Sequence, residues 1–256
     1  MIQMRETTTN NNLLRYTFDN FVVGNGNKHA YDICRAVARE PFRCECNPIY
    51  IYGGLGNGKT HLLRSIANSI SSKNSNVNVL YKSSETFVCE VIEAIRKDYD
   101  ALAEFRNRYS KADILLIDDI HFIEGKECTL QEFGNIFQTL YDNNKQIILS
   151  SARPPKALKD LTDGLISRLA SGIIVHIDAP DYETRMNILK QLAKRKQSQD
   201  IPEEILSYIA ENITNDIRLL EGAFLAICAH SKILNQPIDK EMINTFLQDR
   251  FTNEED

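Results

Sequence analysis

The stretch that decides the fold is YIYGGLGNGKTHLL, residues 50–63, in which glycines, a lysine and a threonine separate two apolar runs. It contains a full P-loop pattern, Gly53-x-x-x-x-Gly58-Lys59-Thr60, with a strand-like run before it and a helical stripe after it. Glycines let backbone N–H groups turn around a phosphate without a Cβ in the way, and the start of the helix adds a partial positive charge. The alternative, a glycine-rich turn without a ligand, does not explain the lysine and threonine in this context.

We therefore predict a nucleotide-phosphate site in this stretch. Lys59 is expected to reach the β- and γ-phosphate oxygens, and the Thr60 hydroxyl is expected to ligate Mg²⁺. The residues assigned to nucleotide binding here are Gly53, Gly54, Gly56, Asn57, Gly58, Lys59, Thr60 and His61.

A second candidate element is ILLIDD, residues 114–119, an apolar strand that ends in two acids. In a parallel sheet such acids lie at the carboxyl edge, where ligands bind. Asp118 is expected to hold magnesium through water, and Asp119 to orient or deprotonate an attacking water. Two acids after a strand are more often solvated than catalytic. Their position about 60 residues after the P-loop lysine favours a Walker B element.

Strand-like and helical patterns alternate along the first part of the chain. The expected strands are residues 48–52, 77–83, 113–118, 146–151 and 173–177. Several are continuously apolar, as in strands covered on both faces, so we predict a parallel α/β sheet. Between them, apolar residues from 87 to 95 form one helical stripe, and Thr129 with Glu132 form a capping box that opens a helix.

Beyond about residue 178 only helical patterns remain, and Pro180 and Pro202 mark helix starts. The predicted organisation is a tail, an α/β nucleotide-binding domain, a small all-helical lid and a second tail, at residues 1–15, 16–178, 179–250 and 251–256.

Composition limits the classes of function. The chain has 256 residues, 43% hydrophobic and 25% charged, and no apolar run approaches the ~18–20 residues of a membrane span. The first residues lack a signal-peptide pattern, so a cytoplasmic location is expected. Six cysteines are expected to be reduced thiols, and Cys44 and Cys46 lack a second pair at zinc spacing. A net charge of −5 argues against an electrostatic grip on DNA over the whole surface.

Several blocks together resemble the central ATPase module of the DnaA family of bacterial replication initiators. They are YTFDNFVVGNGN, the P-loop stretch, FRNRYSKADILLIDDIHFIEGKE, QIILSSARPPK, SRLASGI, PDYETRMNILK and NDIRLLEGAF. They follow in order from about residue 16 to residue 250. The resemblance implies an AAA+ fold, with a five-stranded parallel sheet sandwiched by helices and a helical lid. It also implies ATP rather than GTP, with the segment Tyr16–Val23 lining the adenine pocket.

The resemblance implies further roles for single residues. Arg218 falls at the sensor 2 arginine, which contacts the γ-phosphate from the lid. Arg168 falls at the arginine finger, which reaches the ATP of a neighbouring subunit, and Ser151 remains as a polar contact in the sensor 1 block. Ile92 and Lys126 match positions that contact single-stranded DNA. The plain alternative for each arginine is a surface side chain paired with a nearby acid.

The sequence departs from the family pattern at several positions. Ala152 replaces an aspartate tied to nucleotide affinity, and Gly164 replaces an arginine four residues before the finger. Cys128 replaces a residue that is often basic, so we expect weaker single-strand binding. No basic recognition helix follows the lid before Asp256, so we expect no sequence-specific reading of duplex DNA by this chain.

The leading hypothesis is a DnaA-like ATP-binding switch in replication initiation or its regulation, with slow hydrolysis stimulated by a neighbouring subunit. Its expected partners are further copies of itself or a full-length initiator in the ATP state, and single-stranded DNA. Close alternatives are a regulator resembling Hda and a helicase loader resembling DnaC. A small-molecule P-loop kinase is a distant alternative, because Arg185, Arg195 and Arg218 are scattered and form no acceptor site.

Overall fold

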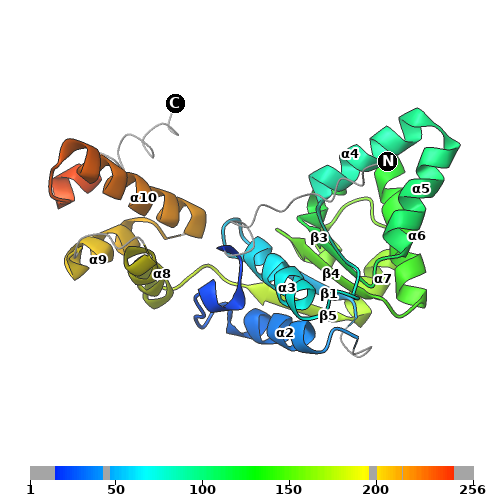
Figure 1. Cartoon of the computed structure of the whole chain (residues 1–256), viewed down its shortest axis with the longest axis horizontal. Helices are drawn as coiled ribbons and strands as arrows, with labels where there is room; N and C mark the ends of the chain where they lie inside the picture. Colours follow the sequence, from blue (N-terminus) through cyan, green and yellow to red (C-terminus); the bar gives the residue numbers. More distant parts are fainter. Residues whose placement is uncertain (1–14, 43–46, 196–200, 215, 245–256) are drawn as a thin grey trace. The chain divides into compact units, whose positions relative to one another are not determined.

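The computed structural model describes residues 15–42, 47–195, 201–214 and 216–244 (Figure 1). Cys44, Cys46, the predicted C-terminal tail and nearly all of the predicted N-terminal tail lie outside these residues. The chain divides into two compact units. The first holds the chain up to Phe21 with Lys28–Gly53 and Gly58–Ile177, and the second holds Val22–Asn27, Gly54–Asn57 and the chain from Asp178 onward.

The first unit is built on one five-stranded sheet in the order β2-β3-β4-β1-β5. Its strands are β1 (Ile49–Gly53), β2 (Val79–Ser83), β3 (Ile114–Asp118), β4 (Gln146–Ser151) and β5 (Ile173–Ile177). Every neighbouring pair is parallel, which confirms the predicted fold class. The carboxyl ends therefore share one edge, where Tyr52 pairs with Ser151 and Ser83 pairs with Asp118.

Helices cover both faces of this sheet, so the unit has three layers (Figure 1). The helices are α2 (Lys28–Arg39), α3 (Lys59–Lys73), α4 (Ser84–Lys97), α5 (Tyr99–Ser110), α6 (Glu127–Asp142) and α7 (Asp163–Ser171). Residues of α2 and α3 pack with Ile51, Leu116 and other side chains of one sheet face. Residues of α4 to α7 pack with Tyr50, Leu149 and others of the opposite face. Burial on both faces explains the continuously apolar strands.

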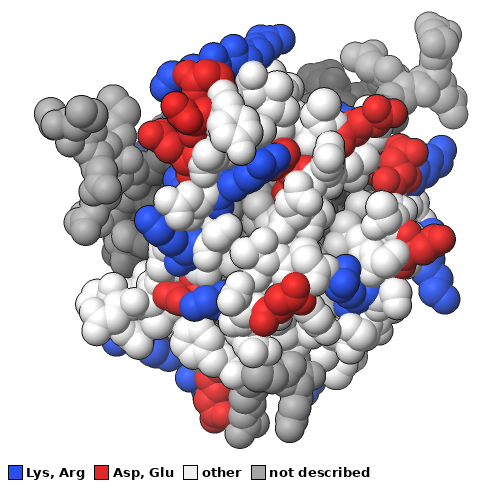
Figure 2. Space-filling view, turned by 90° about the vertical axis from the view of Figure 1, so that its right-hand side faces the viewer, with Lys and Arg blue, Asp and Glu red and all other residues white. Residues whose placement is uncertain are grey.

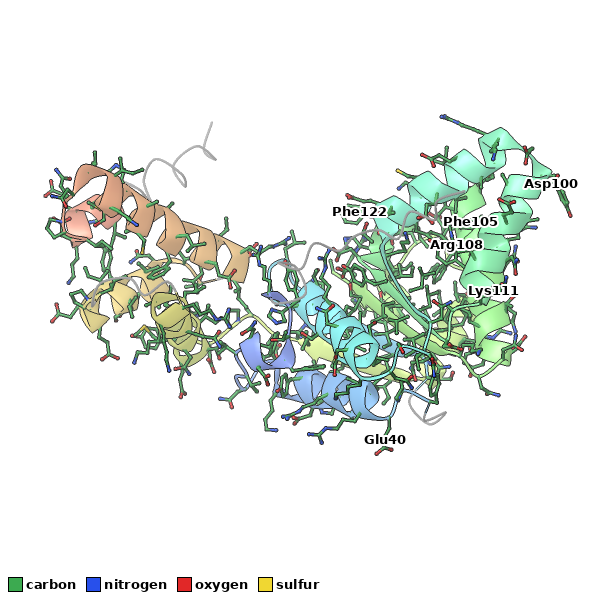
Figure 3. The ribbon with its side chains drawn as sticks, viewed as in Figure 1. Glu40, Asp100, Phe105, Arg108, Lys111 and Phe122 are labelled. Atoms are coloured by element: carbon green, nitrogen blue, oxygen red, sulfur yellow. The ribbon has the colours of Figure 1, made fainter. Side chains whose placement is uncertain are left out.

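Helix α5 is attached to α4 by a polar cluster as well as by apolar contacts. Phe105 and Arg108 lie on α5, and Asp100 and Lys111 lie near its two ends (Figure 3). The Arg108 guanidinium lies 2.6 Å from a Glu90 carboxylate oxygen, and the Tyr109 hydroxyl donates to the same oxygen at 2.8 Å.

Two predictions about helices need correction. The stripe predicted on α4 is narrower than expected, because Ile92 and Ile95 are 39% and 45% exposed while the neighbouring apolar positions are buried. The capping box is wrong, because α6 begins two residues before Thr129, with Lys126 as its N-cap. Thr129 is buried inside the helix, and Glu132 accepts two hydrogen bonds from Arg106 instead of capping a helix end.

The second unit contains the helices α8 (Tyr182–Arg195), α9 (Glu203–Asn212) and α10 (Ile217–Leu234). They share an apolar core of their own, which includes Leu189, Ile209 and Phe224. The starts of α8 and α9 follow the two prolines as predicted, and Pro202 is the N-cap of α9. Arg185 ties α8 to α9, because its guanidinium donates to the Ala210 carbonyl at 2.8 Å and to the Pro180 carbonyl at 2.6 Å.

The surface carries charges of both signs. Figure 2 shows Lys and Arg side chains interspersed with Asp and Glu on the face that it presents, without a broad patch of one sign. On this face, a contact with a polyanion would therefore be local. In the described parts of the chain, every helix is too short or too polar to span a bilayer.

Candidate functional site

The P-loop joins β1 to α3 at the carboxyl edge of the sheet. Strand β1 ends at Gly53 and α3 begins at Lys59, with Gly58 as its N-cap in the left-handed conformation at φ 95°. A Cβ on Gly58 would lie 2.9 Å from the Phe21 ring, and one on Gly53 would lie 2.3 Å from the Ile177 carbonyl oxygen. Only glycine fits these two positions, so they keep the backbone open at the helix start, where anions bind.

Lys59 is held inside this loop. Its side chain belongs to a residue that is only 5% exposed, and its ammonium donates to the Gly53 carbonyl at 2.9 Å. A lysine ammonium held at the start of a helix is suited to a phosphate, because it adds a positive charge to the backbone N–H groups that bind anions there. Thr60 follows on the first turn of α3 and is half-buried.

The segment before α2 packs against the first turn of α3. The His61 Nε2 atom lies 2.8 Å from the Thr17 carbonyl oxygen. The His61 ring meets Tyr16 and Phe21 edge to face, with ring centroids 5.3 and 5.2 Å apart, and Phe21 stacks on Tyr31. These aromatic rings lie directly beside the first turn of α3. Aromatic side chains are typical of the lining of small-molecule pockets, which is the role predicted for Tyr16–Val23.

The two acids at the carboxyl end of β3, Asp118 and Asp119, have different surroundings. Asp118 is 4% exposed and lies at the sheet edge, whereas Asp119 is half-buried and adopts the left-handed conformation at φ 56°. The backbone of Asp119 is tied at both ends, because its N–H donates to Ser150 Oγ at 2.8 Å and its carbonyl accepts from Ser84 Oγ at 2.7 Å. Strand β3 therefore ends in a left-handed turn directly after Asp118.

Two hydroxyls that the sequence analysis did not single out hold Asp118. The Tyr81 hydroxyl, on β2, donates to Asp118 Oδ2 at 2.8 Å, and the Ser150 hydroxyl, on β4, donates to Asp118 Oδ1. Burial raises the pKa of Tyr81 above its ordinary value. The predicted contact residue Ser151 is fully buried and accepts a hydrogen bond from the Arg153 N–H at 3.1 Å.

The chemistry of the oxygen donors fits magnesium. Thr60 offers a hydroxyl and Asp118 a carboxylate, and both are hard oxygen ligands of the kind that Mg²⁺ prefers. Among the described residues, no group of three or more His, Cys, Asp or Glu side chains could hold a metal ion by itself. A site with one or two protein ligands is typical of Mg²⁺ that is bound together with nucleotide phosphates and water.

Ala152 lies just beyond β4, where the family pattern has an aspartate. Its N–H donates to His121 Nδ1 at 3.3 Å, so the proton of a neutral His121 is on Nε2. Burial lowers the pKa of His121 below its ordinary value, which favours that neutral form. This hydrogen bond joins the segment after β4 to the segment after β3, although Ala152 lacks the carboxylate of the family's aspartate.

Arg168 lies in the last turn of α7, and Leu165 and Leu169 are the buried residues of this helix. Within the described residues, no acidic side chain lies within 4 Å of its guanidinium. The plain alternative of a surface arginine paired with an acid therefore receives no support. A Cβ on Gly164 would meet nothing within 4 Å, so this position has room for a larger side chain.

Arg218 lies in the first turn of α10, in the second unit. Asp216 caps this helix, and the Arg218 Nε atom lies 3.8 Å from the same Asp216 oxygen that accepts the backbone N–H. The Arg218 side chain is 69% exposed, so this contact is weak and the guanidinium can leave it at little cost.

The residues matched to single-strand contacts are exposed. Ile92 stands out from α4, and Lys126 and Cys128 lie at the start of α6. The Lys126 ammonium donates to the Phe122 carbonyl, and the Phe122 ring is 44% exposed between β3 and α6 (Figure 3). The surface thus offers apolar and cationic groups, but Cys128 adds no charge.

The fold and these positions define a class of protein. A sheet in the order β2-β3-β4-β1-β5, a P-loop between β1 and α3 and an acidic pair after β3 characterise a P-loop nucleoside triphosphatase of the AAA+ class.

The chain belongs to the bacterial DnaA family, because residues 13–176 match the model of the bacterial DnaA ATPase domain. It is 45% identical over 254 residues to the chromosomal replication initiator protein DnaA of Caldanaerobacter subterraneus subsp. tengcongensis. That match covers 97% of this chain but only 56% of the relative, so the chain spans little more than half the length of that protein.

Solved structures give the same result. Domain III of the Thermotoga maritima replication initiation protein DnaA superposes with a TM-score of 0.85 at 38% identity, covering 92% of this chain and 96% of that one. A structure described as the replication initiator DnaA bound to AMPPCP and single-stranded DNA gives a TM-score of 0.75 at 39% identity. It covers 83% of this chain and 64% of the other.

Proposed function

We propose that this chain is the ATP-binding switch module of a DnaA-type protein in chromosomal replication initiation or its regulation. The observation that carries the proposal is that a buried lysine and a buried carboxylate both lie at or after the carboxyl ends of strands in one parallel sheet. Lys59 follows β1 and Asp118 ends β3. The relative that is described with AMPPCP and single-stranded DNA supports both ligands for this chain.

In this proposal the P-loop amides and Lys59 bind the phosphates, while the Thr60 hydroxyl ligates Mg²⁺ and Asp118 holds it through water. The bound ion would offset phosphate charge and orient the phosphate oxygens. The aromatic segment beside His61 would take the adenine ring. Ser151, buried at the end of β4, would support the γ-phosphate side through the backbone of Arg153.

Hydrolysis is proposed to be slow in the isolated chain. Asp119 would orient the attacking water, but Arg168 would act on the ATP of a neighbouring copy or of a full-length initiator. Arg218 would contact the γ-phosphate and so distinguish ATP from ADP. ATP would then favour assembly, and ADP would not.

Single-stranded DNA would contact the surface around Ile92 and Lys126. Ile92 would contribute an apolar contact and Lys126 one phosphate neutralisation. Because Cys128 contributes no second cation, we expect weak binding with only a shallow dependence on salt.

A metabolic kinase is disfavoured by the use of Arg185. Its guanidinium donates hydrogen bonds to two backbone carbonyls of the helical unit, those of Ala210 and Pro180, so it links α8 to α9. It is therefore a poor candidate for a clamp on an acceptor substrate.

The experiment is a calorimetric titration of the chain with ATP in excess Mg²⁺. Lys59→Ala should weaken binding about 100-fold, because a hydrogen bond to a charged group contributes up to about 3 kcal/mol. Lys73→Ala, in the last turn of the same helix, is the matched control and should bind as the parent does. Equal affinity of the parent and Lys59→Ala would refute the P-loop assignment.

A further inference from the structure

The carboxylate of Asp118 is held by hydroxyls from both neighbouring strands. Strand β3 lies between β2 and β4 in the sheet. Tyr81 reaches Asp118 Oδ2 from β2, at 2.8 Å, and Ser150 reaches Oδ1 from β4. Each carboxylate oxygen thus accepts one O–H bond, and rotation of the carboxylate about its Cβ–Cγ bond would break both.

The direction of the Tyr81 hydroxyl is determined by its other partner. The Arg64 Nε–H, on α3, donates to the Tyr81 oxygen at 3.2 Å. An arginine side chain can only donate, so the single hydroxyl proton of Tyr81 is left for Asp118. The Arg64 guanidinium is itself held between two rings, 4.9 Å from the Tyr81 centroid and 5.0 Å from the Tyr16 centroid.

Ser150 is oriented in the same way. The backbone N–H of Asp119 donates to Ser150 Oγ at 2.8 Å, and a backbone N–H can only donate. The Ser150 proton is therefore directed at Asp118. Two pure donors, one on each side, force two hydroxyls to point their protons at the same carboxylate.

The register of the sheet explains why Tyr81 reaches Asp118. Tyr81 pairs with Leu116 across the strands, and Asp118 lies two residues further along β3. Side chains two residues apart on a strand share a face, so Asp118 lies diagonally opposite Tyr81. A long aromatic side chain with a terminal hydroxyl spans that diagonal, and the Phe side chain lacks the hydroxyl.

We propose that Tyr81, together with Ser150, is a positioning residue that fixes the orientation of Asp118 for the Mg²⁺ that accompanies ATP. This inference rests on the proposed function of the P-loop site. Hydrogen-bond partners behind a metal-binding carboxylate change metal affinity about 10- to 100-fold when they are removed. The remaining lone pairs of Asp118 stay directed away from its two hydroxyl partners and available to a metal-bound water.

The test measures ATP affinity by calorimetry over a series of free Mg²⁺ concentrations and again in excess EDTA. Tyr81→Phe should raise about 10-fold the Mg²⁺ concentration at which the enhancement of ATP affinity is half-maximal. In EDTA, its ATP affinity should stay within about two-fold of the parent's. The matched control is Tyr109→Phe, which also removes a buried hydroxyl that donates to a carboxylate, Glu90, at 2.8 Å. It should leave the Mg²⁺ dependence unchanged.

Two further variants separate the inference from the function on which it rests. Asp118→Asn should remove most of the Mg²⁺ enhancement, and Ser150→Ala should shift it in the same direction as Tyr81→Phe. If Asp118→Asn keeps the parent's Mg²⁺ dependence, the proposed metal site is wrong. If Asp118→Asn loses it while Tyr81→Phe and Ser150→Ala both match the parent, the positioning role is wrong.

The sign of the shift is also decisive. A lower Mg²⁺ requirement in Tyr81→Phe would mean that the hydroxyl competes with the metal for the carboxylate, which contradicts the proposal. Thermal melting without nucleotide should fall in both Tyr81→Phe and Tyr109→Phe, because the first loses the hydrogen bonds of the hydroxyl with Asp118 and Arg64 and the second loses the one to Glu90. A Mg²⁺ shift confined to Tyr81→Phe is therefore not a general loss of stability. If Tyr81→Phe does not fold, Ser150→Ala decides the outcome.

Discussion

The groups proposed to bind the nucleotide differ from the two functional arginines in how strongly the fold restrains them. Arg218 is proposed to sense the nucleotide and Arg168 to act on the ATP of a neighbour. Lys59 and Asp118 are 5% and 4% exposed, and internal hydrogen bonds already restrain both. The Arg218 side chain is 69% exposed and its Nε atom lies 3.8 Å from Asp216 Oδ1, and among the described residues no acidic side chain lies within 4 Å of the Arg168 guanidinium. The first pair is preorganised by folding, whereas the arginines remain available to a ligand or a neighbour.

This difference implies distinct roles for the buried pair, Lys59 and Asp118, and for the two arginines. A preorganised group loses little conformational entropy when the ligand arrives, so it contributes mainly to affinity. An arginine without a close acidic partner loses side-chain entropy when it contacts a γ-phosphate, and that cost is recovered only where the γ-phosphate is present. The restrained groups should therefore control whether a nucleotide binds, and the arginines should control the response to ATP or ADP.

The largest expected effect concerns Arg168. Arg168→Ala should lower assembly-stimulated ATP hydrolysis about 10³-fold, because an arginine finger contributes 10³ or more to turnover. ATP affinity should remain within about two-fold, since the side chain is not expected to contact the nucleotide of its own subunit. Steady-state phosphate release at high protein concentration measures this, with exposed Lys156→Ala as the control. Fast ATP hydrolysis by the parent chain at a dilution where it is monomeric would show that hydrolysis does not need the arginine of a neighbouring subunit.

The next effect concerns neighbouring residues of α4, one buried and one exposed. Val91→Ala should lower the free energy of unfolding by about 2 kcal/mol, because it removes buried methyl groups and leaves a cavity. Ile92→Ala should change it by less than about 0.5 kcal/mol, since Ile92 is 39% exposed. Urea denaturation followed by circular dichroism measures both. Similar losses in the two variants would show that Ile92 belongs to the core and is not a surface contact.

Arg218 should have a smaller effect that depends on the nucleotide. Arg218→Ala should reduce the preference for ATP over ADP about 10-fold, because a charge-assisted hydrogen bond to the γ-phosphate is lost. Competition titrations of the two nucleotides measure the ratio of their affinities. Lys232→Ala, in the last turn of the same helix, provides the control. An unchanged ratio in Arg218→Ala would remove the sensing role.

The smallest effect concerns an ion pair away from the site. The Lys145 ammonium lies 2.7 Å from Asp113 Oδ1, and this hydrogen bond, with one from the Asn78 N–H, lowers the pKa of Asp113. A lowered pKa in the folded state stabilises the fold above the ordinary carboxyl pKa, and this contribution is lost as the pH falls through the lowered value. Lys145→Met should therefore cost less than about 1 kcal/mol at pH 7 and nearly nothing below the lowered pKa. Urea unfolding at several pH values measures this, and exposed Lys111→Met should show no such pH dependence.

Much of the fold could be predicted because its signals are local. Continuous apolar runs predict strands buried on both faces, and the observed strands begin within two residues of the predicted ones. The start of α6 could not be found from a capping pattern, because Glu132 pairs with Arg106 of α5, a tertiary contact. The exposure of Ile92 likewise depends on which helices cover α4 and not on the period of the stripe.

The residues of the candidate site also fall into those with a local sequence signal and those defined by tertiary contacts. Lys59, Thr60 and Asp118 lie in motifs that carry their own chemistry, so the sequence points to them directly. Tyr81 and Ser150 meet Asp118 only through the order and register of the strands, which no single segment encodes. A hydroxyl near the carboxyl end of a strand adjacent to the acidic pair is the one sequence signal that marks such residues.

The central claim is that ATP, bound at the P-loop, switches the chain between states of assembly. The most direct measurement is the mass of the chain by light scattering, in Mg²⁺ with ATP or with ADP, alone and mixed with a full-length initiator. We expect a larger mass with ATP than with ADP, and the same small mass for Lys59→Ala in both nucleotides. A mass that is the same in ATP and ADP, alone and in the mixture, would contradict the account.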